Sequence, residues 1–496
     1  MEHNKKSGIA ADAAKLSFAN IVSLLISLLC VMLLSRYISK FEYGTYSQLN
    51  MVSTLAISVF TLGLPNSINY FFARASEKHE QQKFLQTYYL LITFVCLLAG
   101  AVLCLLLPFL QRYFHNHTLS HYIYVLLLLP LTRVIIQSNS NMLIVIKESR
   151  KLVKYTLTHN FCLLIIVFAI PMLGFDFSGY MLLYMLVQIL FSAYVYYTAA
   201  RIADFRDLAE CRRIYRMPKL QPLKNLLLFS VPLGLGAMVS TLSLELDKLV
   251  IANLMDTDNL AIYTNAAKEL PISMLVSSFT AVLLPKMSRM IKNNQKEGIV
   301  EIWGLSIEIG FSIMLFFALA IIVFAPQVIV FLYSPKYLEG LPVFVICTLI
   351  LVLRSTYFGI VLNVSGNTKF IFYSSIASLI LNFVLNYIFF GLFGIIGPAI
   401  STVSSIAIVN ALQLWYTSKI LAVPIRQVFP WKSLLQILIK NLLLAMPFIA
   451  FVHLIKLQTA TKDILIAIAA GAVWLLLYVL SQRRFLLERW RKLNEY

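Results

Sequence analysis

The sequence has few charged residues, and the acidic ones are fewest. Asp, Glu, Lys and Arg make up 13% of the 496 residues, about half the fraction of a typical soluble domain. Acids number 22 against 41 Lys and Arg, which gives a formal net charge of +19. A chain so poor in charge would expose a large apolar surface to water, so a soluble globular protein is excluded.

Motifs of catalysis and of metal binding are also missing from the sequence. It contains no Walker A motif, no H-E-x-x-H and no G-x-S-x-G, so neither ATP-driven transport nor hydrolytic chemistry within this chain is expected. The 6 cysteines form no C-x-x-C pair, and we interpret them as small buried hydrophobic residues. The histidines have no metal-ligand spacing. We expect neither a cofactor nor a metal, and a protein that is not an enzyme.

The sequence is rich in long apolar runs. Hydrophobic residues make up 60% of the chain and the mean hydropathy is +0.81, enough for roughly 14 spans of about 20 residues each. Charge clusters, Gly and Pro separate the runs. We therefore predict an all-helical polytopic membrane protein with about 14 transmembrane helices, near residues 16–38, 45–71, 85–109, 121–146, 155–175, 178–200, 224–254, 261–285, 303–325, 341–364, 370–391, 394–415, 433–455 and 463–481.

The placement of Lys and Arg predicts the topology. With the N-terminus inside, about 30 of them fall in inside segments and about 6 in outside segments. This asymmetry predicts a multi-pass protein of the cytoplasmic membrane with both termini cytoplasmic. It also accounts for the positive charge, and no basic tract with interleaved aromatics is present, so nucleic acid is not an expected partner.

The connections between the predicted helices divide the chain. Residues 201–223 form the longest one, a basic cytoplasmic linker too short for a catalytic domain. We expect an N-lobe over 1–200 (helices 1–6), a C-lobe over 224–415 (helices 7–12), and two further helices with a basic cytoplasmic tail over 416–496. Any function must then lie between the helices.

Two arginines fall near the middle of predicted spans. Even on a lenient scale, a central arginine costs about 2.5–3.5 kcal/mol, so Arg133 and Arg354 are expected to face a wet cavity or a partner. Arg133 shares one helical face with Gln137 and Asn141 at i, i+4 and i+8. We interpret this face as cavity lining; hydrogen bonding that only joins helices is the alternative.

Further polar groups have two open interpretations. Lys248 and Lys268 either bind substrate or form salt bridges with nearby acids. The nearby acids are Glu245, Asp247 and Glu269. They are also candidates for coupling transport to a proton or Na⁺. A second stripe, which includes Asn382 and Asn386, carries amides and hydroxyls that suit sugar hydroxyls, whereas guanidinium groups suit phosphate oxygens.

Several short motifs resemble one family of transporters. They are LSRYI at 34–38, EYGTY at 42–46, LGLP at 62–65, LDKLVI at 246–251, LPKMS at 284–288, VSGNTK at 364–369 and GIIGPA at 394–399. In these motifs the chain resembles the Wzx-type polysaccharide flippases of the multidrug/oligosaccharidyl-lipid/polysaccharide (MOP) exporter superfamily. Peptidoglycan-precursor flippases share much of the pattern.

The resemblance implies a fold and a substrate. Two six-helix lobes would form a V around a central cationic cavity, with two added helices, and would open alternately to either side. The substrate would be an undecaprenyl-pyrophosphate-linked oligosaccharide. From the positions of the basic residues, we expect the pyrophosphate to be bound by Arg36, Arg133, Lys248, Lys268 and Arg354. Arg74 and Arg289 are expected to lie at the cytoplasmic mouth of the cavity. The polar side chains expected to contact the sugar are Gln137, Asn141, Asn382 and Asn386.

Other functions remain alternatives at this point. A peptidoglycan-precursor flippase, or a drug or organic-cation antiporter of the same superfamily, is nearest, although an antiporter would favour an acidic cavity. A membrane enzyme of polysaccharide assembly would need a long outside loop. A scaffold in a sugar-export complex would not need central arginines. The expected partners are the lipid-linked oligosaccharide, membrane lipids, H⁺ or Na⁺, and the polymerase and glycosyltransferases of the same pathway.

Overall fold

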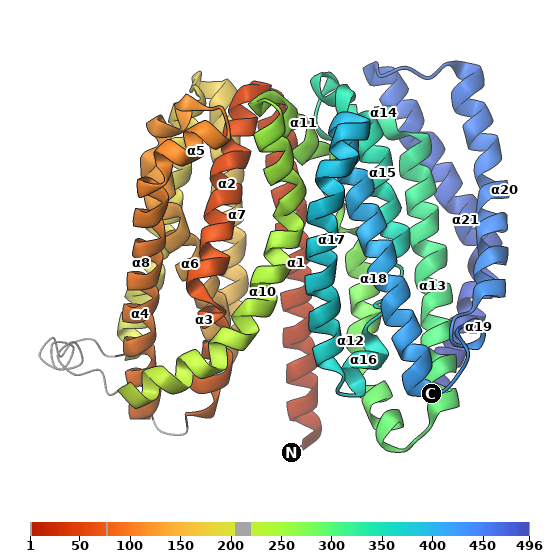
Figure 1. Cartoon of the computed structure of the whole chain (residues 1–496), viewed down its shortest axis with the longest axis horizontal. Helices are drawn as coiled ribbons and strands as arrows, with labels where there is room; N and C mark the ends of the chain where they lie inside the picture. Colours follow the sequence, from red (N-terminus) through yellow and green to blue (C-terminus); the bar gives the residue numbers. More distant parts are fainter. Residues whose placement is uncertain (1, 76–77, 204–219, 496) are drawn as a thin grey trace, which may run out of the picture. The chain divides into compact units, whose positions relative to one another are not determined.

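The protein folds into two compact units built from helices. The computed structural model describes residues 2–75, 78–203 and 220–495, and it contains no strand within these ranges (Figure 1). Unit 1 comprises Met1–Glu245 and Ala252–Ala261, and unit 2 comprises Leu246–Ile251 and Ile262–Tyr496. The greater part of the predicted linker, residues 204–219, lies outside the described residues.

Unit 1 holds the helices of the N-terminal half. Its elements are α1 (Glu2–Tyr37), α2 (Lys40–Thr61), α3 (Leu64–Ser67), the π-helix η1 (Ile68–Phe72), α4 (Lys78–Leu105), α5 (Leu107–Tyr113), η2 (His117–Tyr122), α6 (Ile123–Val145), α7 (Ser149–Leu173), and α8 (Phe177–Ala203). Two more helices, α10 (Leu220–Leu254) and α11 (Thr257–Ala266), are shared between the units, because the chain passes from one unit to the other within them.

Unit 2 holds the remaining helices. Its elements are η3 (Pro271–Ser273), α12 (Met274–Lys292), α13 (Lys296–Val323), α14 (Ala325–Leu332), η4 (Pro335–Gly340), α15 (Leu341–Leu353), α16 (Ile360–Val364), α17 (Thr368–Phe393), η5 (Gly394–Ile396), α18 (Gly397–Leu421), α19 (Ile425–Val428), α20 (Trp431–Ile455) and α21 (Thr461–Glu495). Helices α17 and α18 are joined only by η5, and they pack against each other as an antiparallel pair (Figure 1).

The helices have the lengths and composition of membrane spans. In the described part of the chain, 10 helical segments are long and apolar enough to cross a membrane, or up to 11 if α2 and the α3–η1 pair, bent by 52°, form one span. One of the segments, Thr368–Leu421, contains both α17 and α18. The predicted all-helical polytopic class is confirmed, and the expected number of about 14 spans is roughly compatible with these elements.

Local sequence signals set the bounds of α2, the helix that later contributes to the site in unit 1. Ser39 caps its N-terminus by accepting a hydrogen bond from the backbone N–H of Glu42, whose carboxylate accepts in return from the Ser39 N–H. A left-handed residue, Leu62, and Gly63 with φ of 75° end the helix. Pro65 then stands in the first turn of α3, where its missing N–H costs nothing.

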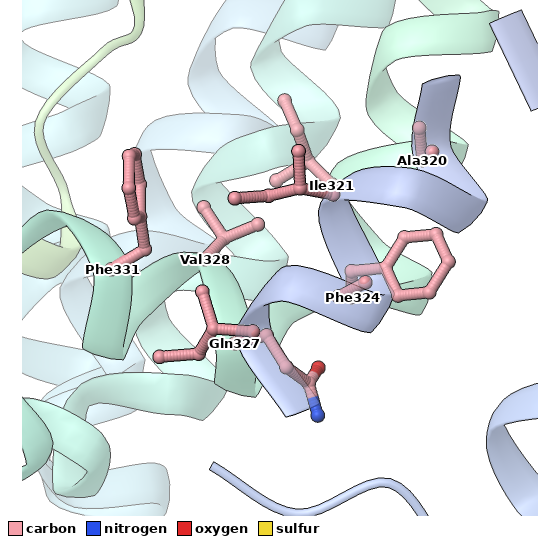
Figure 2. A pocket seen from close by; sticks show the side chains of 10 residues that line it. Ala320, Ile321, Phe324, Gln327, Val328 and Phe331 are labelled. Carbon is pink, nitrogen blue, oxygen red and sulfur yellow. The ribbon is translucent and has the colours of Figure 1, made fainter. Parts of the chain in front are cut away.

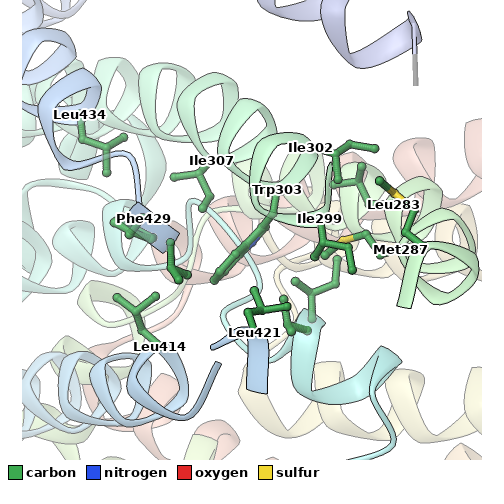
Figure 3. Close-up of a cluster of buried hydrophobic side chains, with 14 of the residues drawn as sticks. Leu283, Met287, Ile299, Ile302, Trp303, Ile307, Leu414, Leu421, Phe429 and Leu434 are labelled. Atoms are coloured by element: carbon green, nitrogen blue, oxygen red, sulfur yellow. The ribbon is translucent and has the colours of Figure 1, made fainter. Parts of the chain in front are cut away.

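Each unit has its own apolar core. In unit 1, the buried side chains of Tyr88, Ile92 and Val134 belong to a cluster that joins α4 to α6. In unit 2, the indole of Trp303 on α13 is fully buried and lies among aliphatic side chains from α12, α13 and α18, with the Phe429 ring nearby (Figure 3). These cores hold the helices that carry the charged residues described next.

Candidate functional site

Arg133 is held in unit 1 by neutral oxygen atoms. It lies on α6 and is half-buried. Its guanidinium donates to the Asn50 side-chain carbonyl, to Thr54 Oγ1 at 3.4 Å and to the Tyr184 hydroxyl at 3.3 Å. Asn50 and Thr54 stand one turn apart on α2, and Tyr184 is on α8. We call these four residues the Arg133 site.

The Arg133 site contains no carboxylate. Within the described ranges, no Asp or Glu forms an ion pair with Arg133. The ring of Tyr46 packs edge-on against the Tyr184 ring, with 6.3 Å between centroids. Glu245 attracts the guanidinium electrostatically but, within the same ranges, forms no ion pair with it. A half-buried cation that is only partly neutralised costs folding free energy, and a bound anion would offset that cost. The site is therefore suited to an anion.

The other polar residues of the Arg133 face are in different surroundings. Gln137 is exposed, and Asn141 donates to the Pro65 carbonyl oxygen at 2.9 Å. Ser138, beside them, is buried and shares a 2.6 Å hydrogen bond with the Tyr88 hydroxyl. Part of the face thus joins helices within unit 1, and the contact of Gln137 and Asn141 with a sugar stays a prediction.

A buried carboxylate organises a second polar group, in unit 2. Asp247 on α10 is only 8% exposed. One of its oxygens accepts from Asn386 Nδ2 at 3.0 Å, and the other accepts from the Tyr263 hydroxyl at 3.0 Å and from Thr402 Oγ1 at 2.5 Å. Asn382 Nδ2 bonds Thr402 Oγ1 at 2.9 Å. We call these five residues the Asp247 network.

Two residues predicted to face sugar belong to this network. Asn386 is fully buried and Asn382 is 5% exposed. Their side chains hydrogen-bond each other at 3.1 Å, and Asn386 donates to Asp247. The Asn386 side-chain carbonyl oxygen is buried without a hydrogen-bond partner. An acceptor without a donor, beside a carboxylate, is an arrangement that a cation satisfies. The sugar role of these two amides stays a prediction, but their observed partners are polar groups of unit 2.

Arg354, unlike Arg133, has a carboxylate partner. It follows the last residue of α15, and its guanidinium forms an ion pair with Glu269, which lies between α11 and η3. The Arg354 side chain is 40% exposed and that of Glu269 is 30% exposed, so the pair is accessible from solvent. Sequence proximity had suggested lysine partners for Glu269, whereas its observed partner is 85 residues away.

The remaining predicted residues are at the surface or half-buried. Lys248 and Glu245 are half-buried on α10, and Lys268 is exposed. The other three predicted arginines are also exposed, and these are Arg36, Arg74 and Arg289. Arg74 donates to the Tyr70 hydroxyl at 2.5 Å and stacks over its ring at 4.0 Å.

Some residues of the two sites were not predicted from the sequence, and these are Asn50, Thr54, Tyr184, Tyr263 and Thr402. The spacing of Asn50 and Thr54 at i, i+4 could have indicated a polar site, because it places two polar groups on one face of an apolar helix. Tyr263 and Thr402 had no comparable pattern. They meet Asp247 only through the packing of α10, α11 and α18.

An apolar pocket of about 200 Å³ lies between α13, α14 and α21 (Figure 2). Ile321, Phe324 and Val328 line it, together with Gln327, whose amide donates to the Gln458 carbonyl oxygen at 2.8 Å. No charged side chain lines the pocket, so it does not suit a phosphate group.

The fold and the sites together define a membrane transporter. Many helices are long and apolar enough to span a membrane, a carboxylate is buried in unit 2 and an arginine is half-buried in unit 1, and the relatives of the chain are transporters rather than enzymes. The chain belongs to the flippases of the MOP exporter superfamily. A family model described as "Polysaccharide biosynthesis protein" matches residues 9–291, and one described as "Lipid II flippase MurJ" matches residues 180–486, each more than half of the chain.

Solved structures show the same fold. The inward closed structure of the lipid II flippase MurJ has a TM-score of 0.69 at 16% identity and covers 95% of this chain and 99% of that one. An inward-facing multidrug resistance MATE transporter has a TM-score of 0.65 at 16% identity, covering 83% and 98%. An uncharacterized membrane protein of Methanocaldococcus jannaschii is 28% identical over 211 residues; the match spans 40% of either chain.

Proposed function

We propose that this protein flips polyprenyl-diphosphate-linked oligosaccharides across the cytoplasmic membrane of a bacterium by alternating access, for assembly of a surface polysaccharide. Its termini would both be cytoplasmic, as the Lys and Arg distribution predicts. The lipid tail of such a substrate stays in the bilayer, while its charged head must cross about 30 Å of hydrocarbon. The protein therefore needs to replace the water around a diphosphate, and no bond is made or broken.

The Arg133 site is the observation that carries this proposal. A diphosphate loses its hydration on entering a bilayer, at a cost that hydrocarbon cannot offset. The guanidinium offers planar, charge-assisted hydrogen bonds to phosphate oxygens. The hydrogen-bond partners of Arg133 among the described residues are all neutral, and Glu245 acts on it only through electrostatic attraction. An anion can therefore bind the guanidinium without breaking a hydrogen-bonded ion pair.

Replacing the charge of Arg133 tests the proposal in cells. We expect Arg133→Gln to lower polysaccharide export at least tenfold, because a charge-assisted hydrogen bond contributes about 1.5–3 kcal/mol. Export is measured in a strain that depends on this chain, with equal amounts of protein in the membrane. Lys440→Gln is the matched control, because Lys440 is an exposed cation of α20 outside both sites. Normal export by Arg133→Gln would contradict the proposal.

The Asp247 network supports a coupling ion as part of the same function. It combines a buried carboxylate with the side-chain oxygens of Thr402 and Asn382 and the unpartnered oxygen of Asn386. Hard cations prefer such oxygen donors, and buried carboxylates in transporters serve as proton relays. We propose that H⁺ or Na⁺ binds at Asp247 and drives the transport cycle.

A peptidoglycan-precursor flippase is the second candidate. The MurJ family model matches residues 180–486, which favours a lipid II substrate. Lipid II also carries a diphosphate on a polyprenyl tail, so the Arg133 site suits both. Depletion of the chain separates them: loss of surface polysaccharide with intact cell walls supports the first function, and lysis through loss of peptidoglycan supports the second. The polymerase and glycosyltransferases expected as partners belong to the first function.

A further inference from the structure

The ion pair between Arg354 and Glu269 joins two interruptions of the helical chain. Arg354 stands where α15 ends, and no helix resumes until Ile360. Glu269 belongs to residues 268–270, which lie outside any helix, and its neighbour Leu270 is extended with ψ of 143°. Interrupted helices in transporters leave backbone groups and side chains available to substrates. The pair is therefore in a place where a ligand can reach it.

The backbone around Arg354 is firmly fixed. The Ser355 carbonyl oxygen lies so near α13 that a Cβ on Gly310 would be 2.2 Å from it. The Leu353 carbonyl oxygen accepts from Asn410 at 2.9 Å, and Thr356 Oγ1 accepts from the buried indole of Trp303 at 3.0 Å. Helices α13 and α18 thus position the guanidinium, whereas Glu269 reaches it from a non-helical segment.

We propose that Glu269 is the resident counter-ion of Arg354, which the diphosphate of the substrate displaces. This inference rests on the function proposed above. Without substrate, Glu269 neutralises Arg354. With substrate, two phosphate groups present more negative charge and more oxygen atoms to the same planar donor than one carboxylate does. When the substrate leaves, Glu269 returns, so the carboxylate keeps the site from holding its anion too tightly.

The pair is suited to exchange because it is weak. With side chains 40% and 30% exposed, both groups keep part of their hydration. Ion pairs at such exposure contribute little to stability, so their loss is easily offset by a better anion. Among the described residues no carboxylate forms an ion pair with Arg133, on which Glu245 acts only through electrostatic attraction, and the two arginines are therefore expected to differ in affinity for an anion.

Removal of the Glu269 charge tests the inference. The full chain is purified in a neutral detergent and titrated with inorganic pyrophosphate by calorimetry. We expect Glu269→Gln to bind pyrophosphate roughly two- to fivefold more tightly than the wild type, the range expected from losing an exposed competitor. Glu269→Asp, which keeps the charge, should stay close to wild type. Arg354→Gln should bind about tenfold more weakly.

Transport separates this role from a purely structural one. In proteoliposomes, Glu269→Gln should lower both KM and kcat for a lipid-linked oligosaccharide, because the anion binds well and leaves slowly. The exchanged pair, Arg354→Glu with Glu269→Arg, should unfold at the wild-type temperature but bind pyrophosphate weakly, since the fixed position no longer carries the cation. Restored binding in the exchanged pair would overturn the inference.

The outcomes distinguish this inference from the proposed function. Equal or weaker pyrophosphate binding by Glu269→Gln, with clear binding by the wild type, overturns the counter-ion role alone. Absence of pyrophosphate binding in the wild type and in every variant overturns the proposed diphosphate substrate and the counter-ion role with it. Equal binding of sulfate and pyrophosphate overturns recognition of a diphosphate at Arg354.

Discussion

At the scale of single residues, the two central arginines have different electrostatic environments. In the described part of the chain, Arg133 donates hydrogen bonds only to the neutral groups of Asn50, Thr54 and Tyr184, whereas Arg354 forms an ion pair with Glu269. In the first arrangement no ion pair among the described residues neutralises the guanidinium, and in the second a carboxylate does so. The proposed transport of an anionic head group requires both attraction and release, and under that proposal Arg133 would attract the anion while Arg354 with Glu269 would release it.

The Asp247 network yields a prediction about ion dependence. We expect Asp247→Asn to abolish the effect of Na⁺ or of pH on the transport rate, because an amide neither binds a cation strongly nor takes up a proton. Asp247→Ala should instead destabilise the protein by about 3 kcal/mol, since the Tyr263, Asn386 and Thr402 donors lose their acceptor. Transport in ion gradients and thermal unfolding measure the two effects. Unchanged ion dependence in Asp247→Asn would contradict the coupling role.

The sequence predicted which residues are polar inside the membrane but not what they touch. The four-residue spacing of Asn382 and Asn386 correctly placed them on one face of a helix, and they hydrogen-bond each other. Their link to Asp247 spans 139 residues of sequence. Such partners depend on how α10 packs against α17 and α18, which helical periodicity cannot reveal.

At the scale of elements, α13 positions Arg354 through a close approach. The Cβ of Gly310→Ala would lie 2.2 Å from the Ser355 carbonyl oxygen, so the backbone must move, at a cost of about 1–3 kcal/mol. Gly304→Ala on the same helix meets nothing within 4 Å and should be neutral or about 1 kcal/mol more stable. Thermal unfolding compares the two, and pyrophosphate binding should weaken only in Gly310→Ala. Equal unfolding temperatures would contradict this packing.

The positions of the helices were predicted better from the sequence than the positions where helices are interrupted. Apolar runs of about 20 residues identify spans because a bilayer demands them, and α13, α17 and α20 lie close to the expected ranges. The breaks before η3 and after α15 were not predicted. Pro271 was a local signal for the first. The second is stabilised by Asn410 and Trp303, which come from other helices.

At the scale of the whole molecule, composition excluded a soluble protein, and the family models together with the fold show membership of the MOP superfamily. The identity of the substrate is a finer matter, because the likeness to MurJ and to the MATE transporter is at 16% identity and concerns the fold. What distinguishes a carrier of anions is the charge of its buried residues. The Arg133 site is for that reason the central feature of the proposed mechanism.

Transport of a labelled lipid-linked oligosaccharide across reconstituted proteoliposomes tests that feature most directly. The rate of head-group movement is compared for the wild type, Arg133→Gln and the Lys440→Gln control. We predict that the wild type and the control move the labelled head group at equal rates, and that Arg133→Gln is slower by at least tenfold while its unfolding temperature is unchanged or higher. Equal rates in all three proteins would contradict the proposal that a membrane-embedded cation carries the diphosphate.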